Sequence, residues 1–87
     1  MPNTLDTVSE RQLLNRITSR PDVFGGKPIV RDMRISVDTI LSLMIQGESE
    51  QTILSDFPDL EPDDLRACLA YARASLPGST SGRNSLK

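Results

Sequence analysis

Helix start and stop signals divide the second half of this chain into three short segments, which strongly limits what it can fold into. Residues that favour a helix start alternate with residues that end one, in the order Ser36, Gly47, Ser49, Pro58, Pro62 and Pro77-Gly78. Serine caps the first turn of a helix, proline fits its first position, and glycine or proline follows its end. The sequence therefore predicts three helices of about 10, 7 and 14 residues. Three helices this short can pack together in only a few arrangements.

Apolar residues within these segments recur at three- and four-residue spacing, as on one face of a helix. The clearest examples are Val37, Ile40, Leu41 and Met44 in the first segment and Leu65, Cys68, Leu69, Ala72 and Leu76 in the third. Three short helices with short connections match a trihelical helix-turn-helix bundle. Bundles of this kind also occur in proteins that never touch DNA, so the pattern alone leaves DNA binding open.

The first half of the chain favours extended structure after a short helix. Ser9 and Gln12 have the spacing of a capping box, which predicts a one-turn helix near residues 10–15. The β-branched pair Ile17-Thr18 could begin a strand, and Gly25-Gly26-Lys27-Pro28 predicts a turn. Residues 29–31 and 34–36 then flank Asp32-Met33, which predicts a β-hairpin with its turn at those two residues. Because Met33 is a poor second residue of a tight turn, a longer loop is the alternative.

We therefore expect one mainly α-helical domain with a short N-terminal β-hairpin and a three-helix bundle. Its parts would be an N-terminal segment with a short helix (1–15), the hairpin region (16–36), the bundle (37–77) and a disordered polar tail (78–87). A chain of 87 residues holds only one such domain. Because a core this small gives marginal stability, association into a homodimer is expected.

The composition argues against catalysis. The chain has no histidine and one cysteine, so the commonest general base and the usual zinc-ligand spacings are absent. We expect neither an enzyme nor a bound metal or cofactor. The sequence also lacks an apolar run of membrane-spanning length, and its first ten residues do not resemble a signal peptide, so we expect a cytoplasmic protein without a membrane partner.

Charge is unevenly distributed along the chain. Residues 35–64 contain eight acidic residues and no basic one, namely Asp38, Glu48, Glu50, Asp56, Asp59, Glu61, Asp63 and Asp64. The basic residues that are candidates for binding nucleic acid or an acidic partner lie earlier, at Arg16, Arg20, Lys27, Arg31 and Arg34. This asymmetry is typical of an oriented interaction surface, although a solvated acidic face has the same pattern.

The acidic residues at the start of the third helix argue against the usual mode of DNA reading. A recognition helix brings its N-terminal residues to the base edges beside the phosphates. Here that end reads Glu61-Pro62-Asp63-Asp64, and acids there oppose phosphate binding. Asp63 and Asp64 have a simpler interpretation, which is to cap the helix and complement its dipole.

Arg31 and Arg34 would lie opposite each other if they flank a two-residue turn. Like charges facing each other across a hairpin are destabilising, and an anionic partner would relieve the repulsion. The alternative is that both arginines extend into water without a partner.

The third helix has a second face of small residues with one aromatic residue, namely Ala67, Ala70, Tyr71 and Ala74. Small side chains permit close approach, and interfaces are enriched in tyrosine, so we interpret this face as a dimer or partner interface. The alternative is that these alanines are simply good helix formers on a surface.

The run Gly25-Gly-Lys-Pro-Ile-Val-Arg31, followed by Arg34-Ile-Ser-Val37, Gly47-Glu-Ser, Asp56-Phe-Pro-Asp-Leu and Ala70-Tyr-Ala, resembles domain-of-unknown-function family 433, the VapB-type antitoxin-like family. The resemblance covers about residues 13–76. Asp32 stands where the family usually has glycine, and Ser36 where proline is common. The resemblance implies a homeodomain-like fold with a short β element, and an antitoxin often encoded beside a PIN-like nuclease toxin.

These observations favour an antitoxin-like protein that binds and neutralises a PIN-like ribonuclease and autoregulates its operon by binding operator DNA. Such nucleases hold Mg²⁺ in an acidic pocket, which an arginine could enter and neutralise. Two other functions remain open, a stand-alone DNA-binding transcription regulator and a dimeric adaptor that does not bind DNA.

Overall fold

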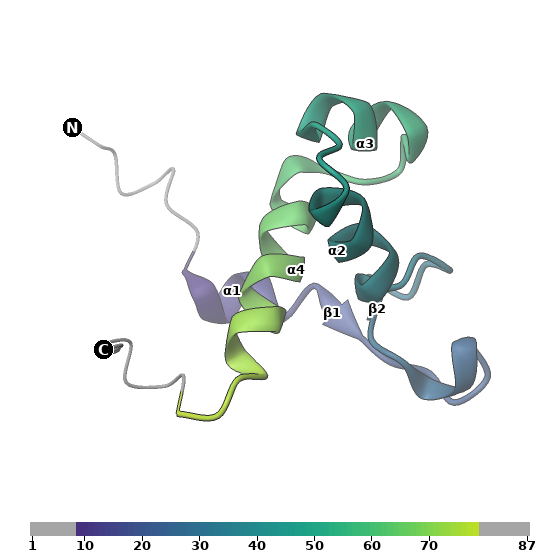
Figure 1. The fold of residues 1–87 in the computed structure, drawn as a ribbon. Helices are drawn as coiled ribbons and strands as arrows, with labels where there is room; N and C mark the ends of the chain where they lie inside the picture. The colour runs from purple at the N-terminus through teal and green to yellow at the C-terminus, as the bar shows by residue number, and fades with distance from the viewer. Residues whose placement is uncertain (1–8, 79–87) are drawn as a thin grey trace.

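The computed structural model describes residues 9–78, and the expectations for residues 1–8 and for the tail beyond Gly78 lie outside this range. The chain runs from α1 (Glu10–Leu14) through β1 (Ile17–Thr18), the 3-10 turn η2 (Phe24–Gly26) and β2 (Ile29–Val30) to three further helices. These helices are α2 (Val37–Ile45), α3 (Glu50–Asp56) and α4 (Pro62–Ala74). Figure 1 shows α2, α3 and α4 packed together, with α1 beside α4 and the β segment below α2. The expected fold class is confirmed.

Local capping sets the helix boundaries, as the sequence predicts. The side chains of Ser9, Ser36 and Ser49 each accept a hydrogen bond from a backbone N–H three residues later, at 3.0–3.1 Å. After α2, the N–H of Gly47 donates to Met44 O and that of Glu48 donates to Leu43 O, both at 3.0 Å. This pair of bonds is a Schellman motif, which needs the left-handed conformation that Gly47 adopts (φ 90°).

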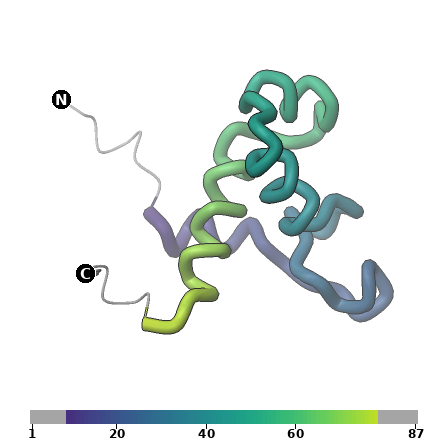
Figure 2. Tube along the Cα trace, in the orientation of Figure 1, coloured from purple at the N-terminus to yellow at the C-terminus, as the bar shows by residue number. Residues whose placement is uncertain are grey.

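The main core lies between β2 and the helices α2, α3 and α4. Its buried members are Val30, Val37, Ile40, Ile53, Leu60, Leu65 and Cys68. A second, smaller cluster lies between α1 and α4, where Leu13 packs on Ala67 and Ala70. The short first helix therefore covers the face of α4 that α2 and α3 leave open (Figure 2). Helix α4 therefore packs on two sides within the same chain, against α2 and α3 on one side and against α1 on the other.

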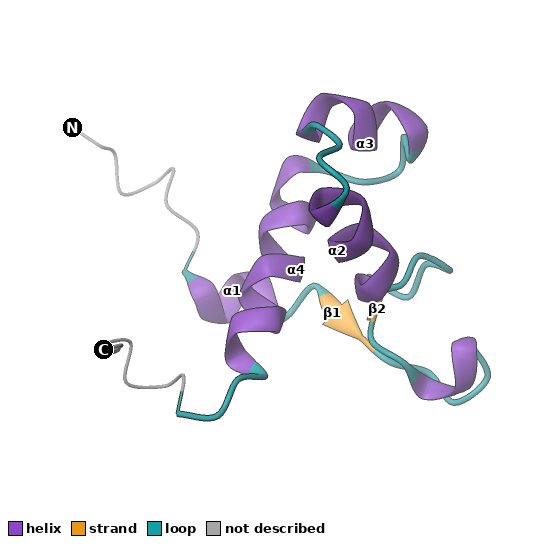
Figure 3. Ribbon diagram, viewed as in Figure 1, coloured by secondary structure: helices purple, strands orange, loops and turns teal. Residues whose placement is uncertain are grey.

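The strand pairing and the turn differ in detail from the sequence-based expectation. The two-stranded sheet pairs β1 with β2, with Ile17 opposite Val30 and Thr18 opposite Ile29, so the segment of residues 19–28 forms the long connection between them (Figure 3). The expected hairpin of residues 29–36 is reduced to one isolated bridge between Ile29 and Ser36.

The tight turn lies one residue earlier than predicted, at Arg31-Asp32 rather than at Asp32-Met33. Arg31 and Asp32 have φ of 45° and 60°, and the N–H of Met33 donates to Val30 O at 2.8 Å. Two successive left-handed residues are the mark of a type I′ hairpin turn, and aspartate tolerates this conformation better than methionine does. Arg31 and Arg34 therefore do not face each other across a two-residue turn, so the expected repulsion between them does not apply.

Candidate functional site

The most highly connected polar group in the described structure is the carboxylate of Asp64, in the first turn of α4. Its side chain is fully buried, and it accepts four hydrogen bonds. One comes from the backbone N–H of Glu61 at 2.7 Å, which is the capping interaction that the sequence predicts. The other three come from the guanidinium groups of Arg16 and Arg31. Four donors match the acceptor capacity of a carboxylate, so the buried charge is fully satisfied.

Arg31 binds Asp64 with two parallel hydrogen bonds. Its Nε donates to Oδ1 at 3.0 Å and its Nη2 donates to Oδ2 at 2.7 Å, and Nη2 also donates to the carbonyl of Asp59 at 2.9 Å. The left-handed turn places Arg31 beside the N-terminus of α4. A bidentate contact of this kind fixes orientation as well as adding energy. It therefore fastens the turn after β2 to the start of α4.

Arg16, in the turn between α1 and β1, binds the same carboxylate. Its Nη1 donates to Oδ1 of Asp64 at 2.9 Å and to Oε1 of Glu61 at 2.8 Å, and its Nη2 lies 3.9 Å from Asp63. The carbonyl of Arg16 also accepts a hydrogen bond from the N–H of Arg31 at 2.7 Å. The two arginines thus approach Asp64 from two adjacent, hydrogen-bonded segments.

The protonation states follow from this geometry. Burial alone would raise the pKa of Asp64, but hydrogen bonds from Arg31, from the Glu61 N–H and from Arg16 outweigh it and lower the pKa below its usual value. Hydrogen bonds to Glu61 and Asp64 raise the pKa of Arg16, and the hydrogen bond to Asp64 raises that of Arg31. All three groups are charged at neutral pH.

This arrangement corrects the interpretation of two of the five candidate basic residues. Arg16 and Arg31 are not free to meet a partner, because their guanidinium groups are used inside the chain to hold Asp64. It also corrects the view that Asp64 only caps α4. The sequence showed only that basic residues precede a long acidic segment. Arg31 and Arg16 lie 33 and 48 residues before Asp64, so no local spacing pattern could pair them with it.

The remaining three candidates lie on the loops of residues 19–34. Arg20, Lys27 and Arg34 are all exposed. Among the residues that the structure describes, the Arg20 side chain forms one ion pair, at 3.5 Å with the exposed Asp22, and a surface pair of this kind contributes little. Within residues 9–78, Lys27 and Arg34 form no ion pair. We call these three residues the loop cations.

Phe24 adds an apolar feature to the same loops. It begins η2 with a left-handed backbone (φ 50°), and Gly25 and Gly26 follow with φ of 65° and 88°. The aromatic side chain is 47% exposed. A bulky residue in this conformation is rare and carries strain of about 1–2 kcal/mol. The sequence predicted a turn at the two glycines but gave no sign that Phe24 shares their conformation.

The predicted interface on α4 is covered in part by the chain itself. Ala67 and Ala70 are buried against Leu13 of α1, so they cannot form an interface between subunits in this conformation. Tyr71 is half-buried against the main core, and Ala74 is exposed at the end of the helix. Leu69 and Leu76, which the spacing assigned to the packed face, are instead 52% and 61% exposed. The homodimer remains a prediction, but its predicted surface has to be moved.

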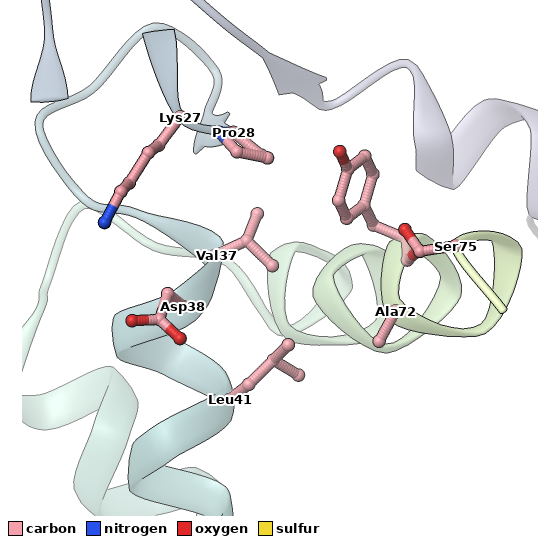
Figure 4. Close-up of a pocket in the computed structure, with 8 residues that line it drawn as sticks. Lys27, Pro28, Val37, Asp38, Leu41, Ala72 and Ser75 are labelled. Carbon is pink, nitrogen blue, oxygen red and sulfur yellow. The ribbon is translucent and has the colours of Figure 1, made fainter. Parts of the chain in front are cut away.

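An apolar groove of about 250 Å³ lies between the start of α2 and the end of α4. The groove is lined by Lys27, Pro28, Val37, Asp38, Leu41, Tyr71, Ala72 and Ser75. Figure 4 shows Val37, Leu41 and Ala72 around the opening, while Lys27 and Asp38 point away from its centre.

Cys68 and the potential metal ligands of residues 9–78 are the remaining groups of chemical interest. Burial raises the pKa of the Cys68 thiol to about 12, and the Asp64 charge adds to this, so the thiolate does not form at neutral pH. No group of three or more potential metal ligands occurs within residues 9–78. In the same range, no helix combines the length and apolar character needed to cross a membrane.

Together, the fold and this site describe a small helix-turn-helix-like domain whose β segment is fastened to the start of its last helix. The sequence matches the family described as a protein of unknown function, DUF433, over residues 17–72. The chain belongs to this family, and the matched residues include Arg31 and Asp64, while Arg16 lies just before the matched range.

Two relatives support this assignment. The uncharacterized protein y4eO of Sinorhizobium fredii is 34% identical over 59 residues, which cover 68% of this chain and 27% of that protein. The chain thus spans little more than a quarter of that relative. The crystal structure of a DUF433 member protein from Anabaena variabilis superposes with a TM-score of 0.68 at 29% identity, covering 83% of this chain and 71% of that one.

Proposed function

We propose that this chain is a non-catalytic, antitoxin-like protein whose loop cations bind the acidic pocket of a PIN-like ribonuclease. The observation that carries the proposal is the division of the basic residues into two groups. Arg16 and Arg31 neutralise Asp64, whereas Lys27 and Arg34 are exposed and have no ion pair within the described residues. A nuclease pocket that holds Mg²⁺ through carboxylates would attract such free cations.

The position of the loops supports the same mode of binding. Figure 1 shows the segment of residues 19–28 extending from the helical bundle, away from α3. Arg34 follows the turn at Arg31-Asp32, which Arg31 fastens to the start of α4. A projecting loop can enter a concave pocket that a flat helical surface cannot reach. The strained and half-exposed Phe24 lies between Arg20 and Lys27, where it would add an apolar contact to the charged ones.

DNA binding through α4 is the weaker proposal. Its first turn presents Glu61 and Asp63, and the two arginines nearby are already bound to acidic groups. An approaching phosphate would have to compete with these carboxylates. If the protein regulates its own operon, the loop cations would have to bind the operator DNA. The feature that supports DNA binding is the trihelical arrangement of α2, α3 and α4. Either activity would take place in the cytoplasm.

The test is inhibition of a PIN-like nuclease, starting with any that a neighbouring gene encodes. We expect the wild-type chain to suppress RNA cleavage and the double variant Lys27→Ala/Arg34→Ala to bind at least about tenfold more weakly, the cost of losing one or two charge-assisted contacts. Arg66→Ala is the matched control, because it removes an exposed cation from α4, far along the chain from the loops.

Unchanged inhibition by the double variant would contradict the proposal. Gel shifts with the DNA upstream of the gene, at two salt concentrations, test the alternative. Binding to this DNA that depends on Lys27 and Arg34, without any effect on the nuclease, would favour the stand-alone regulator.

A further inference from the structure

We propose that the α2–α4 groove is covered by the same groove of a second copy of this chain. The surface in question extends the groove along both helices. We call it the α2–α4 strip, and its residues are Leu41 and Ile45 on α2 and Leu69, Ala72 and Leu76 on and just after α4. None of the strip residues lies on the loops of residues 19–34, although Lys27 and Pro28 also line the groove, so dimer formation and nuclease binding are tested with different variants.

The exposed apolar residues of the described structure are concentrated on this strip. Four large hydrophobic side chains are exposed within residues 9–78, and three of them are Ile45 (84%), Leu69 (52%) and Leu76 (61%). Leu41 and Ala72 line the groove itself. Ile45 lies four residues after Leu41, while Leu69 and Leu76 lie three before and four after Ala72, so each helix presents its members on one face. Clustering of this kind marks an interaction surface.

The direction of the two helices determines which residues lie side by side. Asp38 and Leu41 share the groove with Ala72 and Ser75, so the start of α2 lies beside the end of α4. Figures 1 and 2 show the two helices running in opposite directions from this point. Ile45, one turn after Leu41, is therefore on the level of Leu69, one turn before Ala72.

A twofold axis parallel to the groove would place the α2 side of one copy against the α4 side of the other. Ile45 would then meet Leu69 of the second copy, and Leu41 would meet Ala72. The two sides carry opposite charges in the same arrangement, because Asp38 lines the α2 side of the groove and Arg73 lies on α4 next to Ala72, beside Glu10 of α1. Arg73 is bound only at 3.7 Å to Glu10, so most of its donors are open to a second carboxylate.

This complementarity is the reason for choosing a second copy as the occupant. A twofold interface needs one patch that matches itself, with an apolar centre and edges of opposite charge. A surface that binds an unrelated acidic or basic partner would be expected to carry charges of a single sign at both of its edges. The small size of the chain gives an independent reason, since burying this strip would add to a core of few residues.

Sedimentation velocity of the wild-type protein at micromolar concentration should give twice the chain mass. Leu69→Asp and Ile45→Asp should each give the monomer mass, because each places a charge at the centre of the interface. Phe24→Asp is the matched control. It changes the fourth exposed apolar residue, which lies outside the strip, and should leave the dimer intact. Circular dichroism of each variant verifies that the helices have formed.

Charge reversal tests the twofold geometry. Asp38→Arg and Arg73→Asp should each weaken the dimer, and the double variant should recover most of the lost affinity because the pair is restored with its signs exchanged. The proposal would be overturned if the wild type is a monomer at two loading concentrations that differ 100-fold. It would also be overturned if Leu69→Asp and Ile45→Asp both still form the dimer. Nuclease inhibition measured on Leu69→Asp separates this result from the proposed function, which needs only the loop cations.

Discussion

Arg31 and Arg34 lie three residues apart on the same turn, yet the structure uses them differently. Arg31 makes two parallel hydrogen bonds to the buried Asp64 and a third to the carbonyl of Asp59. Arg34 is exposed and has no ion pair within residues 9–78. The comparison teaches that a basic residue in a sequence motif can hold the fold together while its neighbour stays available for a partner. Burial of the opposite charge makes the difference.

The largest effect is expected when the shared carboxylate is removed. Asp64→Ala leaves two guanidinium groups and the Glu61 N–H without their acceptor, and we expect the free energy of unfolding to fall by about 3 kcal/mol or more. Asp22→Ala is the control, since its carboxylate makes only the exposed contact with Arg20. Urea unfolding monitored by circular dichroism gives both values, and equal values would show that the buried contacts contribute nothing particular.

The capping residues explain why the helices were predictable from the sequence. Ser9, Ser36 and Ser49 bond to backbone groups only three residues away, so the whole interaction is contained in a local pattern. The pairing of β1 with β2 was less evident, because Ile17-Thr18 and Ile29-Val30 are separated by a loop with several possible turns. The turn was placed one residue late because nothing local distinguishes the two positions except the tolerance of Asp32 for left-handed backbone.

The candidate site was predictable only in part. The loop cations and the acidic start of α4 were visible as charge, but the sequence could not tell which arginine meets which acid. That choice depends on the turn at Arg31-Asp32, which brings a distant segment to α4. Likewise, the cover of Ala67 and Ala70 by Leu13 comes from a helix of only five residues. A short helix in the sequence gives no sign of where it packs.

A smaller effect is expected from acid. The folded-state pKa of Asp64 is lowered, so its contribution to stability is fully present above the unfolded value of about 3.9 and is lost as pH falls through the lower folded value. The wild type should therefore lose more stability than Asp64→Ala between about pH 5 and pH 2. Melting temperatures of the two proteins across this range check the prediction, and parallel curves would contradict it.

A small effect on stability is expected at Phe24. Asparagine tolerates left-handed backbone, so Phe24→Asn relieves strain while it removes a half-exposed ring, and the free energy of unfolding should stay within about 1 kcal/mol of the wild type. Binding to the nuclease should weaken, because the apolar contact of the loops is lost. Unaltered binding in titration calorimetry would show that the strained residue has no part in recognition.

The central claim is that Arg31 belongs to the fold and Arg34 to the surface. It is tested most directly by the free energies of unfolding of Arg31→Ala and Arg34→Ala, measured side by side in urea at neutral pH. We predict a loss of about 2 kcal/mol or more for Arg31→Ala, since Asp64 stays buried with fewer donors. For Arg34→Ala we predict a change within about 0.5 kcal/mol. Equal losses in the two variants, or a larger loss in Arg34→Ala, would contradict the account.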